Sequence, residues 1–286
     1  MANITAAMVK ELRERTSVGM MDCKNALAEC QGDMEAAIDF LRQKGLSKAA
    51  KKAGRTTSEG LIGLKLAADN SVAAMVEVLC ETDFVARGDK FKAFAADVAD
   101  KVFTGDPKDA DALGALLGDE LNNQIATLGE NMSVGRFVRF AAEQPGMVGH
   151  YIHTNGKIGV LVELGAKNAA TLAKPELLEL AKNLAMQVAA TGTMALCPES
   201  LDPALIERER QVYRQKTLDE GKPENIVDKI VDGRINKFYQ EVCLMEQAYI
   251  RDDKVTIKNL VKDHCKALGD EIVVRRFALL KLGEGA

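Results

Sequence analysis

The sequence predicts an α+β protein: an N-terminal three-helix bundle, a duplicated core of antiparallel sheet plus helices, and an antiparallel coiled-coil insertion in the second copy. Three observations predict it. Apolar residues recur at helical spacing near the N-terminus, a central stretch matches a later one at a constant shift, and a charge-rich helical segment interrupts the second copy. Helices packed on antiparallel sheets define the α+β class.

The composition is ordinary for a globular chain of 286 residues, with 47% hydrophobic residues, 28% charged residues and a net charge of −4. This charge gives no reason to expect direct binding to nucleic acid or to a membrane. No apolar run approaches the ~18–20 residues of a membrane span, and the N-terminus lacks the apolar stretch of a signal peptide. We therefore expect a cytoplasmic protein.

The first predicted element is a small helical bundle. Ile4, Met8 and Leu12 stand at helical spacing, a second helix repeats the pattern from Met20 to Cys30, and Asp33 is expected to cap a third. The arrangement resembles a ubiquitin-associated-type (UBA-like) bundle. We predict that this bundle and a basic linker occupy residues 1–55.

The end of this region is strongly basic. From Arg42 to Arg55 there are six basic residues and no acidic one. One interpretation is a solvated helix end and linker, and the other is a cationic arm that faces an acidic partner or RNA.

The core is an internal repeat. Residues 60–102 match residues 146–188 at a shift of 86, which preserves both an alternating strand pattern and a helical pattern. Residues 128–140 then match residues 268–280 at a shift of 140. The second copy has therefore gained a net 54 residues between the two matches.

Each copy should contain two strands, a helix, a second helix and a closing strand. Asp69-Asn70 and Asn155-Gly156 mark the hairpin turns, and Asn-Gly favours a type I′ turn. These patterns predict the following boundaries: first copy, 56–141; second copy, 142–194 and 246–286; coiled-coil hairpin, 195–245.

The insertion should be a pair of helices. Asp202-Pro203 is typical of a helix start, and Gly221-Lys222-Pro223 of the turn into a return helix. That helix is lined by four apolar residues, Ile226, Ile230, Val231 and Ile235. Narrow apolar seams fit an antiparallel coiled coil, used either as a spacer or as a contact with a partner or with another subunit.

The sequence offers no recognisable catalytic site. It contains no G-x-x-x-x-G-K-[ST] loop, no G-x-G-x-x-G after a strand, no G-x-S-x-G and no H-E-x-x-H. The G-x-x-G at Gly60 and at Gly146 suits a strand edge better than an RNA-binding loop, because its central residues are apolar. The six scattered cysteines are expected to be free thiols. His150 and His153 have an i,i+3 metal spacing but lie in a predicted strand, and His264 beside Cys265 has no second pair nearby, so we expect no metal. Without a catalytic motif we also expect no catalytic residue and no cofactor.

One corner differs between the copies. At the shift of 86, Asp83 and Phe84 fall on Ala169 and Ala170, whereas the flanking core positions match. A corner that served only the core should have kept similar bulk in both copies. Phe84 either contacts another protein or packs under the N-terminal bundle, which has no counterpart in the second copy.

Three motifs carry a family resemblance: L-R-E-R-T-S-V-G-M-M-D-C-K-N-A-L (12–27), E-T-D-F-V-A-R (81–87) and G-K-P-x-x-I-V-x-K-I-V-x-G-R (221–234). They resemble bacterial translation elongation factor Ts over essentially the whole chain. The resemblance implies a guanine-nucleotide exchange factor for the GTPase elongation factor Tu, without covalent chemistry of its own.

The resemblance also implies which residues act. The corner Thr82, Asp83, Phe84 and Val85 would wedge beside the nucleotide pocket of the GTPase and disturb its Mg²⁺. Further contacts with elongation factor Tu are implied at Met20, Met21, Lys24, His153 and the G-E-N-M-S-V stretch (129–134), especially at Met132. The coiled coil would be another contact element, and no nucleic acid or membrane partner is implied.

Two other functions remain open. The basic stretch from Arg42 to Arg55 would suit an RNA-binding or ribosome-associated protein, whose binding should weaken steeply between about 50 and 200 mM salt. An enzyme with an unrecognised site would reveal itself by a bound cofactor or by turnover of a small substrate.

Overall fold

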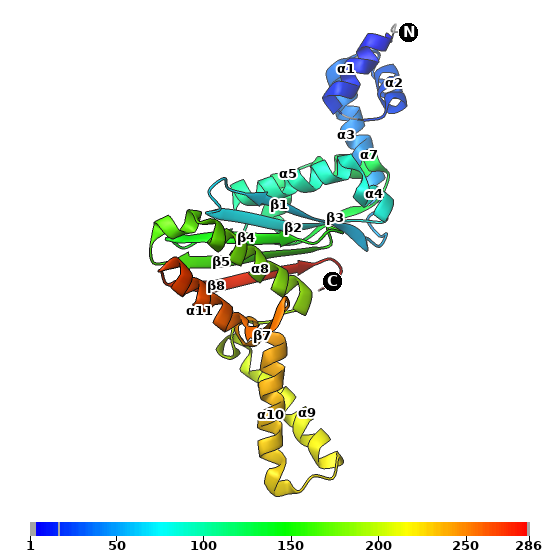
Figure 1. The fold of residues 1–286 in the computed structure, drawn as a ribbon. Helices are drawn as coiled ribbons and strands as arrows, with labels where there is room; N and C mark the ends of the chain where they lie inside the picture. The colour runs from blue at the N-terminus through cyan, green and yellow to red at the C-terminus, as the bar shows by residue number, and fades with distance from the viewer. Residues whose placement is uncertain (1–3, 17, 285–286) are drawn as a thin grey trace. The chain divides into compact units, whose positions relative to one another are not determined.

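A computed structural model describes residues 4–16 and 18–284 (Figure 1). It divides into two compact units. Unit 1 comprises Met1–Leu66, Ala74–Arg139 and Leu280–Ala286, and unit 2 comprises Ala67–Ala73 and Phe140–Leu279. Both units combine helices with a three-stranded sheet, which confirms the predicted α+β class.

Unit 1 begins with three helices: α1 (Ala6–Thr16), α2 (Met20–Glu29) and α3 (Met34–Ala50). Asp33 caps α3, as predicted, by accepting a hydrogen bond from the backbone N–H of Ala36 at 3.0 Å. The apolar faces of the helices enclose a small core in which Leu12, Cys23 and Leu27 are fully buried. α3 continues to Ala50, so much of the basic stretch is helix rather than linker.

The rest of unit 1 is a sheet with helices. Its strands, in the order β1-β2-β3, are β1 (Glu59–Leu66), β2 (Val72–Cys80) and β3 (Met132–Ala141). Its helices are α4 (Asp83–Arg87), α5 (Asp89–Gly105), α6 (Ala110–Leu117) and α7 (Glu120–Leu128). α5 lies along the sheet (Figure 1) and buries Phe91, Phe94, Val98 and Val102 at the helical spacing that the sequence shows.

Unit 2 repeats this plan. Its strands, in the order β4-β5-β8, are β4 (Gly146–Ile152), β5 (Ile158–Ala166) and β8 (Ile272–Lys281). β4 and β5 pair antiparallel, from Gly146 opposite Gly165 to Ile152 opposite Gly159. Its other elements outside the insertion are η1 (Ala169–Ala173), α8 (Pro175–Thr191), β6 (Ala248–Tyr249), β7 (Asp252–Thr256) and α11 (Ile257–Leu268).

The elements carry the shifts read from the sequence. β2 and β5, α4 and η1, and α5 and α8 each begin and end at positions that differ by 86. β3 and β8 differ by 140 at both ends. The repeat in the sequence is therefore a repeat of secondary structure.

Two glycines of the G-x-x-G pairs allow close packing of helix on strand in both copies. A Cβ built on Gly63 would lie 2.3 Å from the carbonyl oxygen of Ala95 in α5. A Cβ built on Gly149 would lie 2.5 Å from the Cβ of Ala181 in α8. Gly63 lies inside β1 and Gly149 inside β4, so these glycines allow a helix to pack closely on the strand, as the strand-edge interpretation predicts.

Each copy also buries one carboxylate against an arginine of its third strand. The Glu77 carboxylate, 6% exposed, pairs with the Arg136 guanidinium, and this bond raises the pKa of Arg136. The Glu163 carboxylate, 2% exposed, pairs with Arg276 at 2.6 Å and also with Arg275 at 3.3 Å. The first copy has Gly135 in place of that second arginine.

The predicted type I′ turn is wrong. Such a turn needs positive φ at both central residues. In the turn closed by the hydrogen bond from the Gly156 N–H to the His153 carbonyl, Gly156 has φ 71° but neither Thr154 nor Asn155 has positive φ. The left-handed residue lies at the fourth position, where Asn70, with φ 58°, stands in the other hairpin.

The insertion forms a helical hairpin of α9 (Pro203–Asp219) and α10 (Glu224–Val242) (Figure 1). Asp202 caps α9 through the N–H of Ala204 at 2.9 Å. Val227, Val231 and Ile235 are the buried seam residues of α10, whereas the predicted seam residue Ile226 is 39% exposed. Two ion pairs link the helices, Arg210–Asp232 and Arg214–Asp228, and a third joins Arg234 of α10 to Glu220, the residue that follows α9.

A buried amide network lies where the hairpin joins the rest of unit 2. Gln187 of α8 donates to Gln247 and to the Ala248 carbonyl, both at 3.0 Å, and accepts from the Ile250 N–H at 2.9 Å. Gln247 donates in turn to the Glu241 carbonyl of α10 at 2.8 Å. Both glutamines are at most 2% exposed and make several bonds, as buried amides require.

Candidate functional site

The corner after β2 presents one large aromatic side chain to solvent. Phe84, on α4, is 84% exposed, the largest fraction among the exposed large hydrophobic residues that the structure describes. Its neighbours hold the helix down, because Ala86 is 4% exposed and Val85 packs against the core of unit 1. The corner therefore separates an anchored side from a free side, and Phe84 lies on the free side.

Asp83 lies beside Phe84 at the first position of α4. Its carboxylate forms an i,i+4 ion pair with Arg87 at 2.9 Å, and its side chain is 40% exposed. An exposed pair of this kind contributes little to stability. Asp83 is thus accessible to another molecule, although Arg87 already neutralises part of its charge.

Thr82 caps α4 and is itself held by Glu130. The Thr82 hydroxyl accepts from the Val85 N–H at 3.3 Å and donates to Glu130 Oε1 at 2.5 Å. Glu130 Oε2 accepts from the N–H groups of Glu81 at 3.1 Å and Thr82 at 3.0 Å. One carboxylate thus takes three hydrogen bonds from two consecutive residues.

The bonding between these two segments is reciprocal. The Asn131 N–H donates to the Glu81 carboxylate at 2.5 Å, which is the largest cause of the lowered pKa of Glu81. The Cys80 thiol donates to the Thr82 carbonyl at 3.2 Å, and burial raises the pKa of Cys80 to about 12. The corner that carries Phe84 is thus fixed from several directions.

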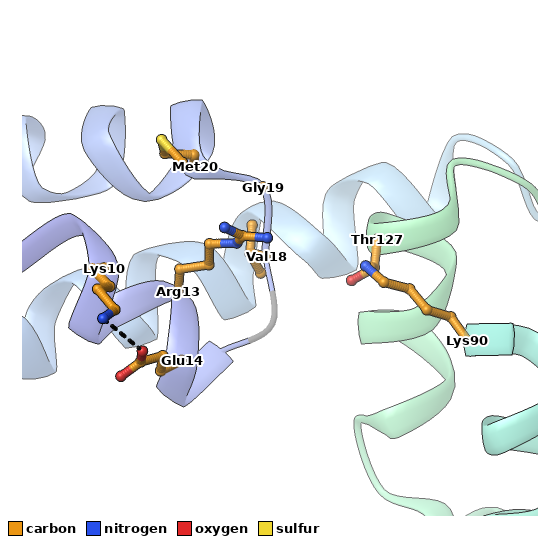
Figure 2. Close-up of a pocket in the computed structure, with 8 residues that line it drawn as sticks. All are labelled: Lys10, Arg13, Glu14, Val18, Gly19, Met20, Lys90 and Thr127. Atoms are coloured by element: carbon orange, nitrogen blue, oxygen red, sulfur yellow. Dashed lines mark ion pairs between the residues drawn. The ribbon is translucent and has the colours of Figure 1, made fainter.

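A second exposed surface lies on the N-terminal bundle. Met20 is 58% exposed and Met21 is 65% exposed, and with Lys24 they line a groove that Val9 and Arg13 of α1 also line. Figure 2 shows a neighbouring pocket of unit 1 that shares Met20 and Arg13, with the Lys10–Glu14 ion pair at 3.8 Å along one wall. The two methionines give this face flexible apolar surface beside positive charge.

His153 of unit 2 is exposed and follows β4. Its Nδ1 lies 3.0 Å from the Tyr151 hydroxyl, which orients the ring. The structure leaves this side chain open to solvent.

Met132 differs from the expectation of a surface contact. It is 3% exposed, at the start of β3, and belongs to the core of unit 1. Its counterpart at the shift of 140, Ile272, is equally buried at 4%. The Met132 side chain is a core residue and offers no surface for a partner.

Four of the six basic residues between Arg42 and Arg55 pair with three carboxylates of the chain. Arg42 pairs with Asp119, and Arg55 pairs with Glu81 at 3.4 Å. Lys44 and Lys48 both pair with Asp22 at 3.1 Å. Burial of Asp22 acts to raise its pKa, but the hydrogen bonds from Lys48 and Lys44 together outweigh it and lower the pKa. These contacts favour a structural use of the stretch over a cationic arm that reaches for RNA.

Other kinds of site find little support in the described part of the chain. No group of three or more His, Cys, Asp or Glu residues there is arranged to hold a metal ion. No helix among the described residues is long and apolar enough to cross a membrane. All six cysteines are free, with Cys23, Cys80 and Cys243 buried and the other three partly buried.

Comparison with known proteins places the chain in the class of translation elongation factors. The profile of the family described as Elongation factor TS matches residues 81–284. Elongation factor Ts of Desulfovibrio desulfuricans is 60% identical over 283 residues, which cover 99% of each chain. The protein of that name from Clostridioides difficile is 48% identical over 292 residues, which cover 100% of this chain and 94% of the relative. The chain belongs to the elongation factor Ts family.

Proposed function

We propose that the protein is a guanine-nucleotide exchange factor for elongation factor Tu. It binds the GTPase, promotes release of GDP and allows reloading with GTP, and it hydrolyses no nucleotide itself. One observation supports this most: Phe84, in the E-T-D-F-V-A-R motif of the family, is 84% exposed on a firmly anchored helix. An aromatic side chain held rigidly in solvent is suited to enter another protein.

The proposed mechanism is mechanical and electrostatic. A GTPase holds its nucleotide through Mg²⁺, which bridges phosphate oxygens, and through backbone groups around the phosphates. Phe84, inserted beside that pocket, would displace a packed element by ~1 Å, and packed interfaces convert small shifts into discrete rearrangements. Asp83 would then disturb the Mg²⁺ and phosphate environment, or accept hydrogen bonds from freed backbone donors. Val85, packed on the core of unit 1, and Thr82, which caps α4, would hold the helix in place while Phe84 inserts.

The energetics require coupling between the two ligands of the GTPase. If the exchange factor weakens GDP binding, GDP weakens binding of the exchange factor by the same factor. The factor must therefore bind the nucleotide-free GTPase most tightly. Incoming GTP then expels it.

The remaining contacts would provide affinity and orientation. We propose that Met20, Met21 and Lys24 form a contact on the bundle, that His153 forms one on unit 2, and that the hairpin of α9 and α10 forms another. The bundle would be UBA-like and the hairpin an antiparallel coiled coil. The proposed bounds of the hairpin domain are residues 195–245, and Leu244, near its end, packs in the core of unit 2.

The proposed function is tested by release of labelled GDP from elongation factor Tu. Substoichiometric protein should accelerate release, because an exchange factor dissociates and acts again. Incubation of the protein alone with GTP provides the control for hydrolysis. No acceleration at micromolar protein would exclude the proposal.

A further inference from the structure

We propose that Glu130 is a positioning residue for exchange: it fixes the corner so that Phe84 is held in its working orientation before the GTPase arrives. The inference rests on the proposed function and adds to it a residue that never needs to touch the partner. It is carried by the three hydrogen bonds that the Glu130 carboxylate accepts from Glu81 and Thr82.

The helix under Phe84 is too short to hold itself. α4 has five residues, Asp83–Arg87, and isolated helices of this length are not stable in water. Side-chain burial fixes one face of it, through Val85 and Ala86. The start of the helix, next to Phe84, needs a separate restraint.

Glu130 supplies that restraint through Thr82. The Thr82 hydroxyl has one proton, and it points to Glu130 Oε1 at 2.5 Å, so a lone pair remains to accept the Val85 N–H at 3.3 Å. Oε2 meanwhile fixes the backbone of Glu81 and Thr82. Glu130 therefore sets both the path of the chain into α4 and the direction of its cap.

In the second copy an acidic residue also holds the backbone at the start of the short helix, but that helix carries no aromatic residue. Asp270, at the shift of 140 from Glu130, accepts from the N–H of Asn168 at 3.0 Å. Asn168, at the shift of 86 from Thr82, caps η1 through the N–H of Ala170 at 3.0 Å. The restraint thus belongs to both corners, and the first copy alone has Phe84 on it. This gives a matched control within one chain.

The experiment compares Glu130→Ala, Glu130→Gln and Asp270→Ala with the wild type. GDP release from elongation factor Tu is measured against exchange-factor concentration, which separates the maximal rate from the half-saturating concentration. Thermal unfolding is followed for each variant. Glutamine can still accept both backbone N–H groups at its one oxygen and donate to Thr82 Oγ1, so it serves as the conservative rescue.

If Glu130 positions Phe84, Glu130→Ala should lower the maximal rate about tenfold with less than about a threefold change in half-saturation, since other contacts still form the complex. Glu130→Gln should restore most of the rate. Asp270→Ala should lower the unfolding temperature by about as much as Glu130→Ala and leave exchange at the wild-type level. Glu130→Ala in a Phe84→Ala background should cost little further rate, because the positioned group is gone.

Three results would overturn the inference while leaving the proposed function intact: an unchanged maximal rate in Glu130→Ala, an equal loss in Glu130→Gln, or an equal loss in Asp270→Ala. The second would mean that the charge itself acts on the partner, and the third that general destabilisation lowers exchange. If Glu130→Ala does not fold, Thr82→Val, which keeps the shape and both backbone bonds, decides the question: an unchanged maximal rate overturns the inference. Failure of the wild type to accelerate release would instead overturn the proposed function.

Discussion

The corner after β2 and the corner after β5 are built on the same frame and present different side chains. Each is a single helical turn, capped by a polar residue whose backbone is held by an acidic residue that follows a left-handed glycine, Gly129 or Gly269. The first corner exposes Phe84, and the second has Ala170 at the same place. Because the two corners share their backbone geometry, that geometry belongs to the fold. Phe84 is the feature that only the first corner has.

The two acidic residues are also held differently. In the first copy the hydroxyl comes from the cap residue Thr82 itself. In the second, hydrogen bonding from Thr171, three positions later, is the largest cause of the lowered pKa of Asp270. Both corners thus keep an acidic acceptor, although the hydroxyl that bonds to it comes from different positions.

The largest expected difference between the copies concerns the buried carboxylates. Arg136→Met removes every side-chain partner of Glu77 and leaves the carboxylate one backbone N–H, that of Arg136. Removing one partner of a buried pair costs about 3–5 kcal/mol. Arg276→Met should cost less, about 1–2 kcal/mol, because Glu163 keeps Arg275 and the Glu143 N–H. Urea unfolding of both variants measures the difference, and equal losses would contradict it.

The next effect concerns Phe84 itself. Phe84→Ala should slow GDP release at least about tenfold, equivalent to about 1.4 kcal/mol at the transition state. It should change the free energy of unfolding by less than about 0.5 kcal/mol, because the side chain is exposed and the equivalent corner of the second copy folds with Ala170 at this position. Ala170→Phe is the matched control and should leave exchange unchanged. A large loss of stability with normal exchange would show that Phe84 serves the fold.

The hairpin is the other difference between the copies, and its removal should affect exchange less than Phe84→Ala does. Replacement of residues 208–236 by a short Gly-Ser linker removes the seam residues Val227, Val231 and Ile235 but keeps the apolar contacts at the hairpin base. Unit 2 should still unfold cooperatively, since its core is a separate cluster. The half-saturating concentration in exchange should rise about fivefold, or about 1 kcal/mol. A loss of cooperative unfolding would show that the hairpin is part of the core.

The smallest effect is chemical. Cys80 should resist alkylation by iodoacetamide at pH 8 in the native protein, because burial raises its pKa to about 12 and its thiolate is scarce. Ala166→Cys places a thiol at the equivalent position of the second copy and should be similarly protected. Labelling is measured by peptide mass spectrometry. Rapid labelling of Cys80 alone would mean that the first corner opens more readily than the second.

The sequence predicts the repeat well because two independent periodicities support it. A single shift aligns the alternating apolar residues of β2 and β5 and the helical spacing of α5 and α8. Boundaries follow local chemistry where a cap is present, as at Asp33 and Asp202. The α+β class therefore follows from the sequence alone.

The site is predicted less completely, for physical reasons. The resemblance implies a surface contact for Met132, yet this residue begins a strand and its repeat partner is an apolar isoleucine, Ile272. That apolar match in the second copy is the signal that identifies Met132 as a core residue. Glu130 lies in the G-E-N-M-S-V stretch that the resemblance implies as a contact, but its bonds to Glu81 and Thr82 were not predicted, because a carboxylate that accepts backbone N–H groups leaves no pattern in one copy. The alignment of Glu130 with Asp270, and of Thr82 with Asn168, is the signal that could have found it.

The sequence predicts Ile226 as a seam residue of α10, but its neighbour Val227 occupies that place. The apolar pattern of α10 allows either residue in the seam, and one step along a helix rotates a side chain by about 100°. The structure decides for Val227, which is fully buried in the seam, whereas Ile226 is 39% exposed. Such a choice depends on the partner helix, which sequence spacing does not contain.

The buried side chains of Gln187 and Gln247 fix the base of the hairpin and so limit how far its other end can move. At ~1.5 Å per residue, the 17 residues of α9 extend the arm by about 25 Å. A rotation of only about 5° at the base would move the far end by roughly 2 Å, more than an interface tolerates. Gln187 and Gln247 bond to α8, α10 and the β6 segment together, so their amides admit few orientations of the arm. The position of the far end of the hairpin thus depends on two buried side chains at its base.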